Sequence, residues 1–264
     1  MNFPPGREVM DIDWERVNAA IWRSRRGCLR PVAELDPVRL SELVGIDAQK
    51  AELLRNTERF MAGLPANNAL LWGARGTGKS SLIKAMLNEF ASGGLRLVEI
   101  GRHELGDLPE IIDPVRDSSR RFIVYCDDFS FEASDDSYVG LKSVLEGSVE
   151  KPPDNVLFYA TSNRRHLLPE YMQDNLATRT VDGEVHYSDA VEERISLSDR
   201  FGLWLSFYQP DMQAYLAIVD SYFRDFEGDR VALHQAAKLF AMGRASHSGR
   251  TARQFFNSCS GREF

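Results

Sequence analysis

The chain has 264 residues and is 43% hydrophobic, enough to bury a substantial core as one large domain or two unequal ones. A formal net charge of −7 and a pI near 5.4 argue against general nucleic-acid affinity, which depends on Lys and Arg beside phosphates. No apolar run approaches the roughly 20 residues of a membrane span, and residues 1–18 lack the apolar centre of a signal peptide. We therefore expect a cytoplasmic protein without membrane contact.

Residues 1–40 are expected to form a short helical segment. Trp14, Val17 and Ile21 fall at helical spacing among charged residues, and the polar, proline-containing stretch at 26–37 ends this pattern. From 41 to 208, longer segments, several with helical periodicity, separate the apolar runs NALLW, LRLVEI, FIVYC, NVLFYA and LWLSFY. This alternation predicts an α/β domain in which a parallel sheet lies between helices.

Residues 209–264 show no further strand signal. The apolar residues at 212–223 recur at helical spacing, and VALHQAAKLFAMG and TARQFFNSC continue the helical pattern. We expect a small, all-helical C-terminal domain.

Residues 70–84, LLWGARGTGKSSLIK, contain the pattern G-x-x-x-x-G-K-[ST] between an apolar strand and a helical stretch. Its glycines let backbone N–H groups point inward, and the helix N-terminus adds partial positive charge, so the loop can cradle phosphate oxygens. We expect Lys79 to reach the β and γ phosphates and the Ser80 hydroxyl to bind Mg²⁺. An ordinary glycine-rich turn is the alternative, which the flanking strand and helix disfavour. The expected nucleotide-binding residues here are Gly73, Ala74, Arg75, Gly76, Thr77, Gly78, Lys79, Ser80 and Ser81.

A second acidic site follows the run FIVYC. Asp127 comes at the carboxyl end of a predicted central strand, where ligands bind in open α/β sheets, and we assign it to the metal. Asp128 is expected to polarise the attacking water, a role that needs a carboxylate within hydrogen-bond reach. Glu132, further along the loop, is a competing base. The alternative for the two aspartates is a solvated strand end.

Further polar residues follow or precede the remaining apolar runs. Asn163 ends NVLFYATSN and is suited to orient water or sense the γ-phosphate, although such a residue is often only a loop cap. Arg200 precedes another apolar strand, and Arg250 and Arg253 lie at the start of the last helix. Arginine suits these sites because its planar fork pairs with phosphate oxygens bidentately. A surface arginine is the alternative for each.

In chain order, LVGID, GARGTGKS, CDD, ATSN, DRFG and GRTARQF resemble the box before the P-loop, Walker A, Walker B, sensor 1, the arginine finger and sensor 2 of AAA+ ATPases. The stretches at 40–82 and 126–147 resemble a bacterial ATP-binding family catalogued as domain of unknown function 815. DRFG before an apolar strand is similar to the Holliday-junction branch-migration motor, and the paired aspartates are similar to replication initiators and helicase loaders.

The AAA+ resemblance implies ATP and Mg²⁺ as cofactors, a helical C-terminal lid and a homo-oligomer, either a ring or another ATP-dependent assembly. Within such an assembly, Arg200 would face the nucleotide of the neighbouring subunit. Much of the superfamily has Asp-Glu where this chain has two aspartates, so the choice between Asp128 and Glu132 stays open. Which of Arg250 and Arg253 is sensor 2 also stays open.

Three functions remain. The favoured one is an ATPase that hydrolyses ATP to remodel an unidentified protein or protein–nucleic-acid complex; no N-K-x-D motif for guanine is present. The second is a DNA-associated motor or loader, supported by the arginine-rich stretch at 23–30 and by Arg164, Arg165 and His166. The third is a slow-hydrolysing switch, in which nucleotide binding assembles a scaffold.

Overall fold

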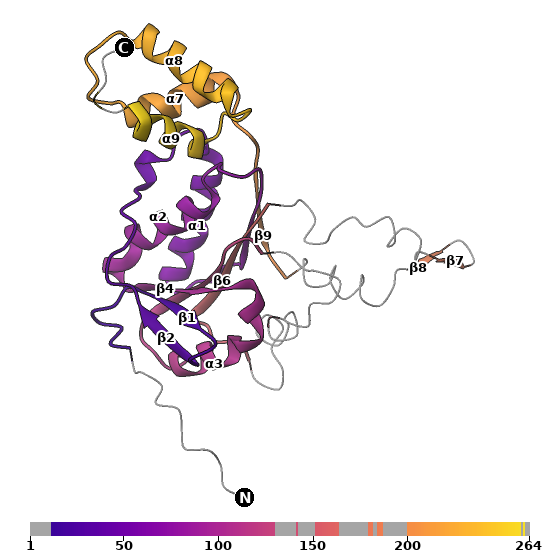
Figure 1. Cartoon of the computed structure of the whole chain (residues 1–264). Coiled ribbons are helices and arrows are strands. Elements are labelled where there is room, and N and C mark those ends of the chain that lie inside the picture. Colours follow the sequence, from indigo (N-terminus) through magenta and orange to yellow (C-terminus); the bar gives the residue numbers. More distant parts are fainter. Residues whose placement is uncertain are drawn as a thin grey trace, which may run out of the picture.

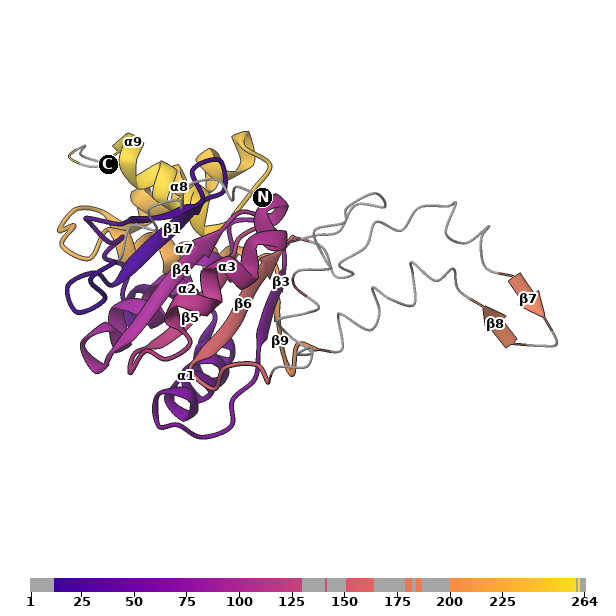
Figure 2. The ribbon, with the colours of Figure 1, turned by 90° about the horizontal axis from the view of Figure 1, so that it is seen from below.

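The structure, a computed structural model, describes residues 12–129, 141, 151–163, 179–181, 184–186, 200–259 and 261. Its centre is a seven-stranded sheet with the order β2-β1-β4-β5-β6-β3-β9 (Figures 1 and 2). All neighbouring pairs run parallel except β1 and β2. The strands are β1 (Ala19–Arg23), β2 (Cys28–Pro31), β3 (Ala69–Gly73), β4 (Leu95–Ile100), β5 (Arg121–Cys126), β6 (Val156–Ser162) and β9 (Leu203–Phe207). A separate antiparallel pair comprises β7 (Arg179–Val181) and β8 (Glu184–His186).

Helices cover both faces of the sheet, and each face has its own hydrophobic core. One core lies under α1 (Asp47–Met61) and α2 (Lys79–Phe90), and the other lies against α3 (Leu108–Ile112) (Figure 1). Short 3-10 turns are η1 (Leu40–Glu42), η2 (Ala91–Gly93), η3 (Arg102–Asp107) and η4 (Asp113–Val115). The parallel sheet between helices, predicted from the alternating pattern, is confirmed.

Three helices form the C-terminal region: α7 (Met212–Tyr222), α8 (Arg230–Gly243) and α9 (Gly249–Cys259). They share a third core, which includes Tyr215, Leu233 and Phe255. The carboxylates of Asp211 and Asp229 accept hydrogen bonds from backbone N–H groups in the first turns of α7 and α8, as N-cap residues do. The helical C-terminal region is therefore confirmed. No helix in the described parts of the chain is long and apolar enough to cross a membrane.

The expected N-terminal helix is wrong. Residues 19–23 and 28–31 form the hairpin strands β1 and β2, and β1 pairs in parallel with β4. The apolar residues in this segment are explained by packing against the sheet and not by a helix. The Trp14 ring, for example, packs edge-on against the ring of Phe122 in β5, with 5.0 Å between the ring centroids. Pairing and packing with distant strands thus override the local pattern. The hairpin extends the central sheet.

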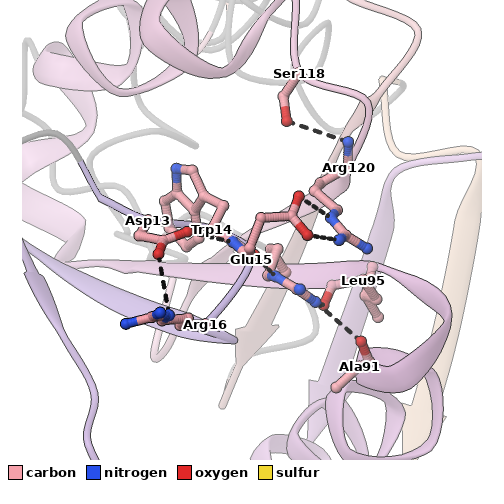
Figure 3. A network of polar contacts seen from close by, with 9 residues as sticks. Asp13, Trp14, Glu15, Arg16, Ala91, Leu95, Ser118 and Arg120 are labelled. Atoms are coloured by element: carbon pink, nitrogen blue, oxygen red, sulfur yellow. Dashed lines mark hydrogen bonds and ion pairs between the residues drawn. The ribbon is translucent and has the colours of Figure 1, made fainter.

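A network of polar contacts holds the segment before β1 in place (Figure 3). Arg96 of β4 is 3% exposed, and its Nε donates a hydrogen bond to the carbonyl oxygen of Trp14 at 2.7 Å. Its Nη1 donates to the carbonyls of Ala91 and Leu95 at 2.9 and 2.8 Å. Glu15 forms an ion pair with Arg120, next to the start of β5. These contacts use the carbonyl of Trp14 that a helix would have bonded internally, which explains why the segment is not helical.

Candidate functional site

The glycines of the P-loop allow the chain to turn sharply between β3 and α2. Gly73, Gly76 and Gly78 all have positive φ, at 128°, 74° and 96°. A Cβ on Gly73 would lie 2.0 Å from the backbone oxygen of Phe207 in β9, and a Cβ on Gly76 would lie 2.8 Å from the Ser248 hydroxyl just before α9. Glycine is therefore needed for the curl of the loop and for its contacts with the edge strand and the C-terminal helices.

Lys79 is a buried cation held by neutral oxygens. Lys79 is 6% exposed. Its Nζ donates hydrogen bonds to the backbone carbonyls of Gly73 and Ala74 at 2.9 and 2.7 Å, and to Asn163 Oδ1 at 3.1 Å. Within the described residues, no carboxylate lies within ion-pair distance of it. Burial lowers the pKa of Lys79 to about 8, although Asp127 and Asp128 act to raise it. An anion bound at this ammonium would offset the cost of its burial.

Ser80 and Asp127 form the side of the site suited to a metal. The Ser80 hydroxyl donates to Asp127 Oδ1 at 2.9 Å, and the Thr161 hydroxyl of β6 donates to the same oxygen. Burial acts to raise the pKa of Asp127, but hydrogen bonds from neighbouring groups, Thr161 first, outweigh it and hold the pKa below its ordinary value. The carboxylate therefore stays ionised, and with the serine hydroxyl it offers the hard oxygen ligands that Mg²⁺ prefers.

Asp128 and Asn163 meet beside Lys79. Asp128 has a φ of 54°, in the left-handed region, and its N–H donates to the Thr161 hydroxyl at 3.1 Å. The Asn163 amide nitrogen donates to Asp128 Oδ1 at 2.7 Å, while its amide oxygen accepts from Lys79. The amide thus links the cation to the carboxylate. A non-glycine residue in this conformation costs about 1 to 2 kcal/mol, which the surrounding contacts must offset.

Thr161 was not among the residues predicted for the site, yet it contacts both aspartates. It lies two residues before Asn163 on β6, and alternate residues of a strand point to the same face. The strand alternation in ATSN was therefore a signal that could have identified it.

These residues line one cavity of about 490 Å³, within the size range of ligand pockets. Its polar side consists of the P-loop, both aspartates, Thr161 and Asn163. Its other side comes from the segment before α1 and from α7, and includes Leu43, Val44, Ile46, Ile218 and Tyr222. A side with a buried cation and a glycine-rich loop, joined to an apolar side, suits a molecule with a polyphosphate and a flat base.

Arg250 and Arg253 of α9, two of the residues expected to bind nucleotide, both line the cavity. The charge of Arg250 helps to lower the pKa of Lys79. Burial raises the pKa of Tyr222, and the charge of Arg253 opposes this rise. The charge of Arg250 is thus felt at Lys79, and that of Arg253 at Tyr222 of α7.

Arg200 does not line this cavity. It is exposed and lies three residues before β9, whose first residue, Leu203, pairs with Ala69 at the start of β3. Phe207 at the other end of β9 pairs with Gly73, where the P-loop begins. About 13 Å of strand therefore lies between the start of β9 and the level of the P-loop. Glu132, Arg164, Arg165 and His166 lie outside the described residues.

Comparison with solved structures finds the RuvB Holliday junction branch migration motor of Thermotoga maritima, 13% identical, with a TM-score of 0.48 over 84% of this chain and 72% of that chain. A point variant of the same motor matches over the same shares at 15% identity and the same TM-score. A likeness this distant says nothing of activity. No curated protein matches the sequence. The family described as "Protein of unknown function (DUF815)" matches residues 15–263, nearly the whole chain, and the chain belongs to that family.

Proposed function

We propose that this chain is an ATPase, which binds ATP with Mg²⁺ in the cavity at the P-loop and hydrolyses it to ADP and phosphate. The observation that carries the proposal is the buried Lys79 ammonium, which among the described residues bonds only to neutral oxygens and which faces a loop of positive-φ glycines. Polyphosphate is the ligand that complements such a site. Binding of a fluorescent ATP analogue, competed by ATP, is the direct test, and absence of binding would refute it.

The residues present fit a magnesium–nucleotide complex. Ser80 and Asp127 would hold the metal, and Lys79, the P-loop and the α9 arginines would bind the phosphates. When bound, Mg²⁺ offsets charge on the β and γ oxygens. Asp128 accepts a proton from the attacking water, and Asn163 keeps the Asp128 carboxylate oriented through the 2.7 Å hydrogen bond. The left-handed backbone at Asp128 directs that carboxylate beside Asn163.

Asp128→Asn is expected to keep ATP binding and to lower turnover by about 10²- to 10⁴-fold, because an amide cannot take a proton from water. Phosphate release and analogue binding, measured on the same preparation, test both halves of this statement. Glu132→Gln is the matched control, since Glu132 is the competing base. If Glu132→Gln loses turnover and Asp128→Asn keeps it, the base is Glu132.

The affinity for ATP is expected to fall as pH rises through about 8, by about tenfold per unit above the pKa of Lys79. Only the protonated amine attracts phosphate, and bound phosphate raises the pKa, so binding takes up protons near pH 8. Calorimetry in two buffers of different ionisation enthalpy measures this uptake. Lys79→Arg, which stays charged, should lose the dependence. An affinity that is constant between pH 7 and 9 would show that Lys79 does not contact the phosphates.

We further propose that ATP hydrolysis drives the remodelling of a protein or protein–nucleic-acid complex by a homo-oligomer. The placement of Arg200 supports this, because it is exposed at the far end of β9 from its own P-loop, on a surface that a neighbouring subunit can contact. Affinity capture with the Asp128→Asn variant in the presence of ATP is the experiment that identifies the client. Recovery of the same proteins with a variant that cannot bind ATP would count against nucleotide-dependent engagement.

One observation favours a DNA-associated motor or loader as a second candidate. Arg23, Arg25 and Arg26 lie exposed at the β1–β2 hairpin, and within the described residues none of them forms an ion pair. A polyanion is the natural partner of such a group. Single-turnover hydrolysis with and without single-stranded or duplex DNA separates the alternatives. Stimulation by DNA favours the motor, and slow hydrolysis under all conditions favours an assembly switch.

A further inference from the structure

Tyr125 of β5 has a buried hydroxyl without a hydrogen bond of standard geometry. The residue is 2% exposed, and within the described part of the chain no polar atom meets the distance and angle of an ordinary hydrogen bond to its hydroxyl oxygen, although the phenol lies close enough to Asp127 to help lower the pKa of that carboxyl. An unsatisfied polar group in the protein interior costs free energy, and most buried hydroxyls are paired. The ring packs in the core under α2, so phenylalanine would fill the same space without this cost. Packing alone therefore does not account for the hydroxyl.

The strand directs this hydroxyl toward the proposed metal site. Tyr125 and Asp127 are two residues apart along the β5 direction, so both side chains belong to the face of the sheet that α2 covers. Burial raises the pKa of Tyr125, and the Asp127 carboxylate raises it further, while the hydroxyls of Ser80 and Thr161 oppose this. The phenol thus ends among the groups that surround the Asp127 carboxylate.

The hydrogen bonds around Asp127 leave room for another donor. The hydroxyls of Ser80 and Thr161 both donate to Oδ1, and no described side chain forms a standard hydrogen bond to Oδ2. If Ser80 Oγ binds a metal, the carboxylate loses part of the contact that now orients it. The Tyr125 hydroxyl is then a buried donor that can hydrogen-bond to the Asp127 carboxylate in place of Ser80.

Resting on the proposed function, we propose that Tyr125 is a positioning residue for the magnesium–nucleotide site. Its hydroxyl donates to the Asp127 carboxylate when metal and nucleotide are bound, and it thereby fixes the orientation of that carboxylate. This role accounts for a buried hydroxyl that packing alone does not explain. Tyr125 touches neither nucleotide nor metal, and acts through Asp127.

Tyr125→Phe tests the inference through thermal unfolding of the full chain under three conditions: without nucleotide, with a non-hydrolysable ATP analogue and EDTA, and with the analogue and Mg²⁺. Without nucleotide, the variant should unfold at the wild-type temperature or above, because an unpaired buried hydroxyl is removed. The increment from the analogue alone should be unchanged. The further increment from Mg²⁺ should shrink, and half-saturation should need about tenfold more Mg²⁺, the size of one hydrogen bond to a charged group.

Tyr159→Phe is the matched control. Tyr159 of β6 is also fully buried, but its hydroxyl lies 3.0 Å from the Asn56 amide and 3.0 Å from the Thr57 hydroxyl of α1. Removing the Tyr159 hydroxyl takes one hydrogen bond from each of these two partners, which keep their bonds to the carbonyls of Asn67 and Leu53. This variant should unfold at a lower temperature without nucleotide and keep the full Mg²⁺ increment.

The outcomes separate this inference from the function on which it rests. A Tyr125→Phe protein with the wild-type Mg²⁺ increment overturns the inference, whether or not its unfolding temperature changes. A wild-type protein that gains stability from the analogue but none from Mg²⁺ overturns the proposed metal site, and the role of Tyr125 with it. A smaller Mg²⁺ increment in Tyr125→Phe and an unchanged one in Tyr159→Phe support the positioning role.

Discussion

Lys79→Ala is expected to weaken ATP binding by more than about 100-fold, enough to abolish it at ordinary concentrations. The ammonium is the cation beside the expected β and γ phosphates, and charge-assisted hydrogen bonds are each worth about 1.5 to 3 kcal/mol. Its contacts with Gly73, Ala74 and Asn163 hold it inside the loop. Titration with a fluorescent ATP analogue measures the loss. Near-normal affinity in this variant would refute the P-loop assignment.

Two controls keep this result from being confused with misfolding. Lys84→Ala removes the same charge from the same helix, but the Lys84 ammonium pairs with Asp36 at 3.1 Å and does not line the cavity at the P-loop. ATP affinity should be normal in that variant. Lys79→Met keeps the apolar stem and removes a desolvated charge, so it should fold at least as stably as wild type while failing to bind ATP.

The fold was largely predictable where the sequence carries long, uninterrupted patterns. The helical stretch expected after the P-loop is α2, and each apolar run between 68 and 208 forms a strand of the central sheet. The segment before residue 40 was not predictable in this way. Its strands depend on the pairing of β1 with β4, and on the bond between Arg96 and the carbonyl of Trp14, 82 residues away in the chain. No local pattern contains that information.

In the candidate site, too, the residues set by a local sequence pattern were predictable, and those brought together by distant contacts were not. Residues of the contiguous P-loop motif could be named from sequence because the loop itself creates their geometry. The apolar side of the cavity could not, since Ile218 and Tyr222 come from α7 and reach the site only through the packing of the C-terminal helices. The hydrogen bond between Asn163 and Asp128 also joins two strand ends that lie 35 residues apart. Their meeting depends on the parallel pairing of β5 and β6.

Arg200→Ala is expected to leave ATP binding almost normal and to lower turnover by about 10³- to 10⁵-fold, as loss of an arginine finger does in other P-loop systems. The turn at Arg200 is firmly held, because Phe201 is buried and a Cβ on Gly202 would lie 2.4 Å from Asn67 Oδ1. The arginine is therefore presented on a fixed surface at the edge strand β9. Phosphate release at saturating ATP measures the effect, and turnover per subunit in wild type should rise with protein concentration as subunits assemble.

Mixing variants tests whether Arg200 acts on the neighbouring subunit. Subunits carrying Arg200→Ala keep an intact P-loop, and subunits carrying Lys79→Ala keep Arg200. In a mixed assembly, a complete site forms wherever a Lys79→Ala subunit supplies its Arg200 to the P-loop of an Arg200→Ala neighbour. We expect the mixture to recover turnover that neither variant has alone. Subunits with both substitutions are the control, since they assemble without supplying a finger and should restore nothing. If the first mixture stays inactive and wild-type turnover does not depend on concentration, Arg200 is a structural arginine and the shared-site mechanism is wrong.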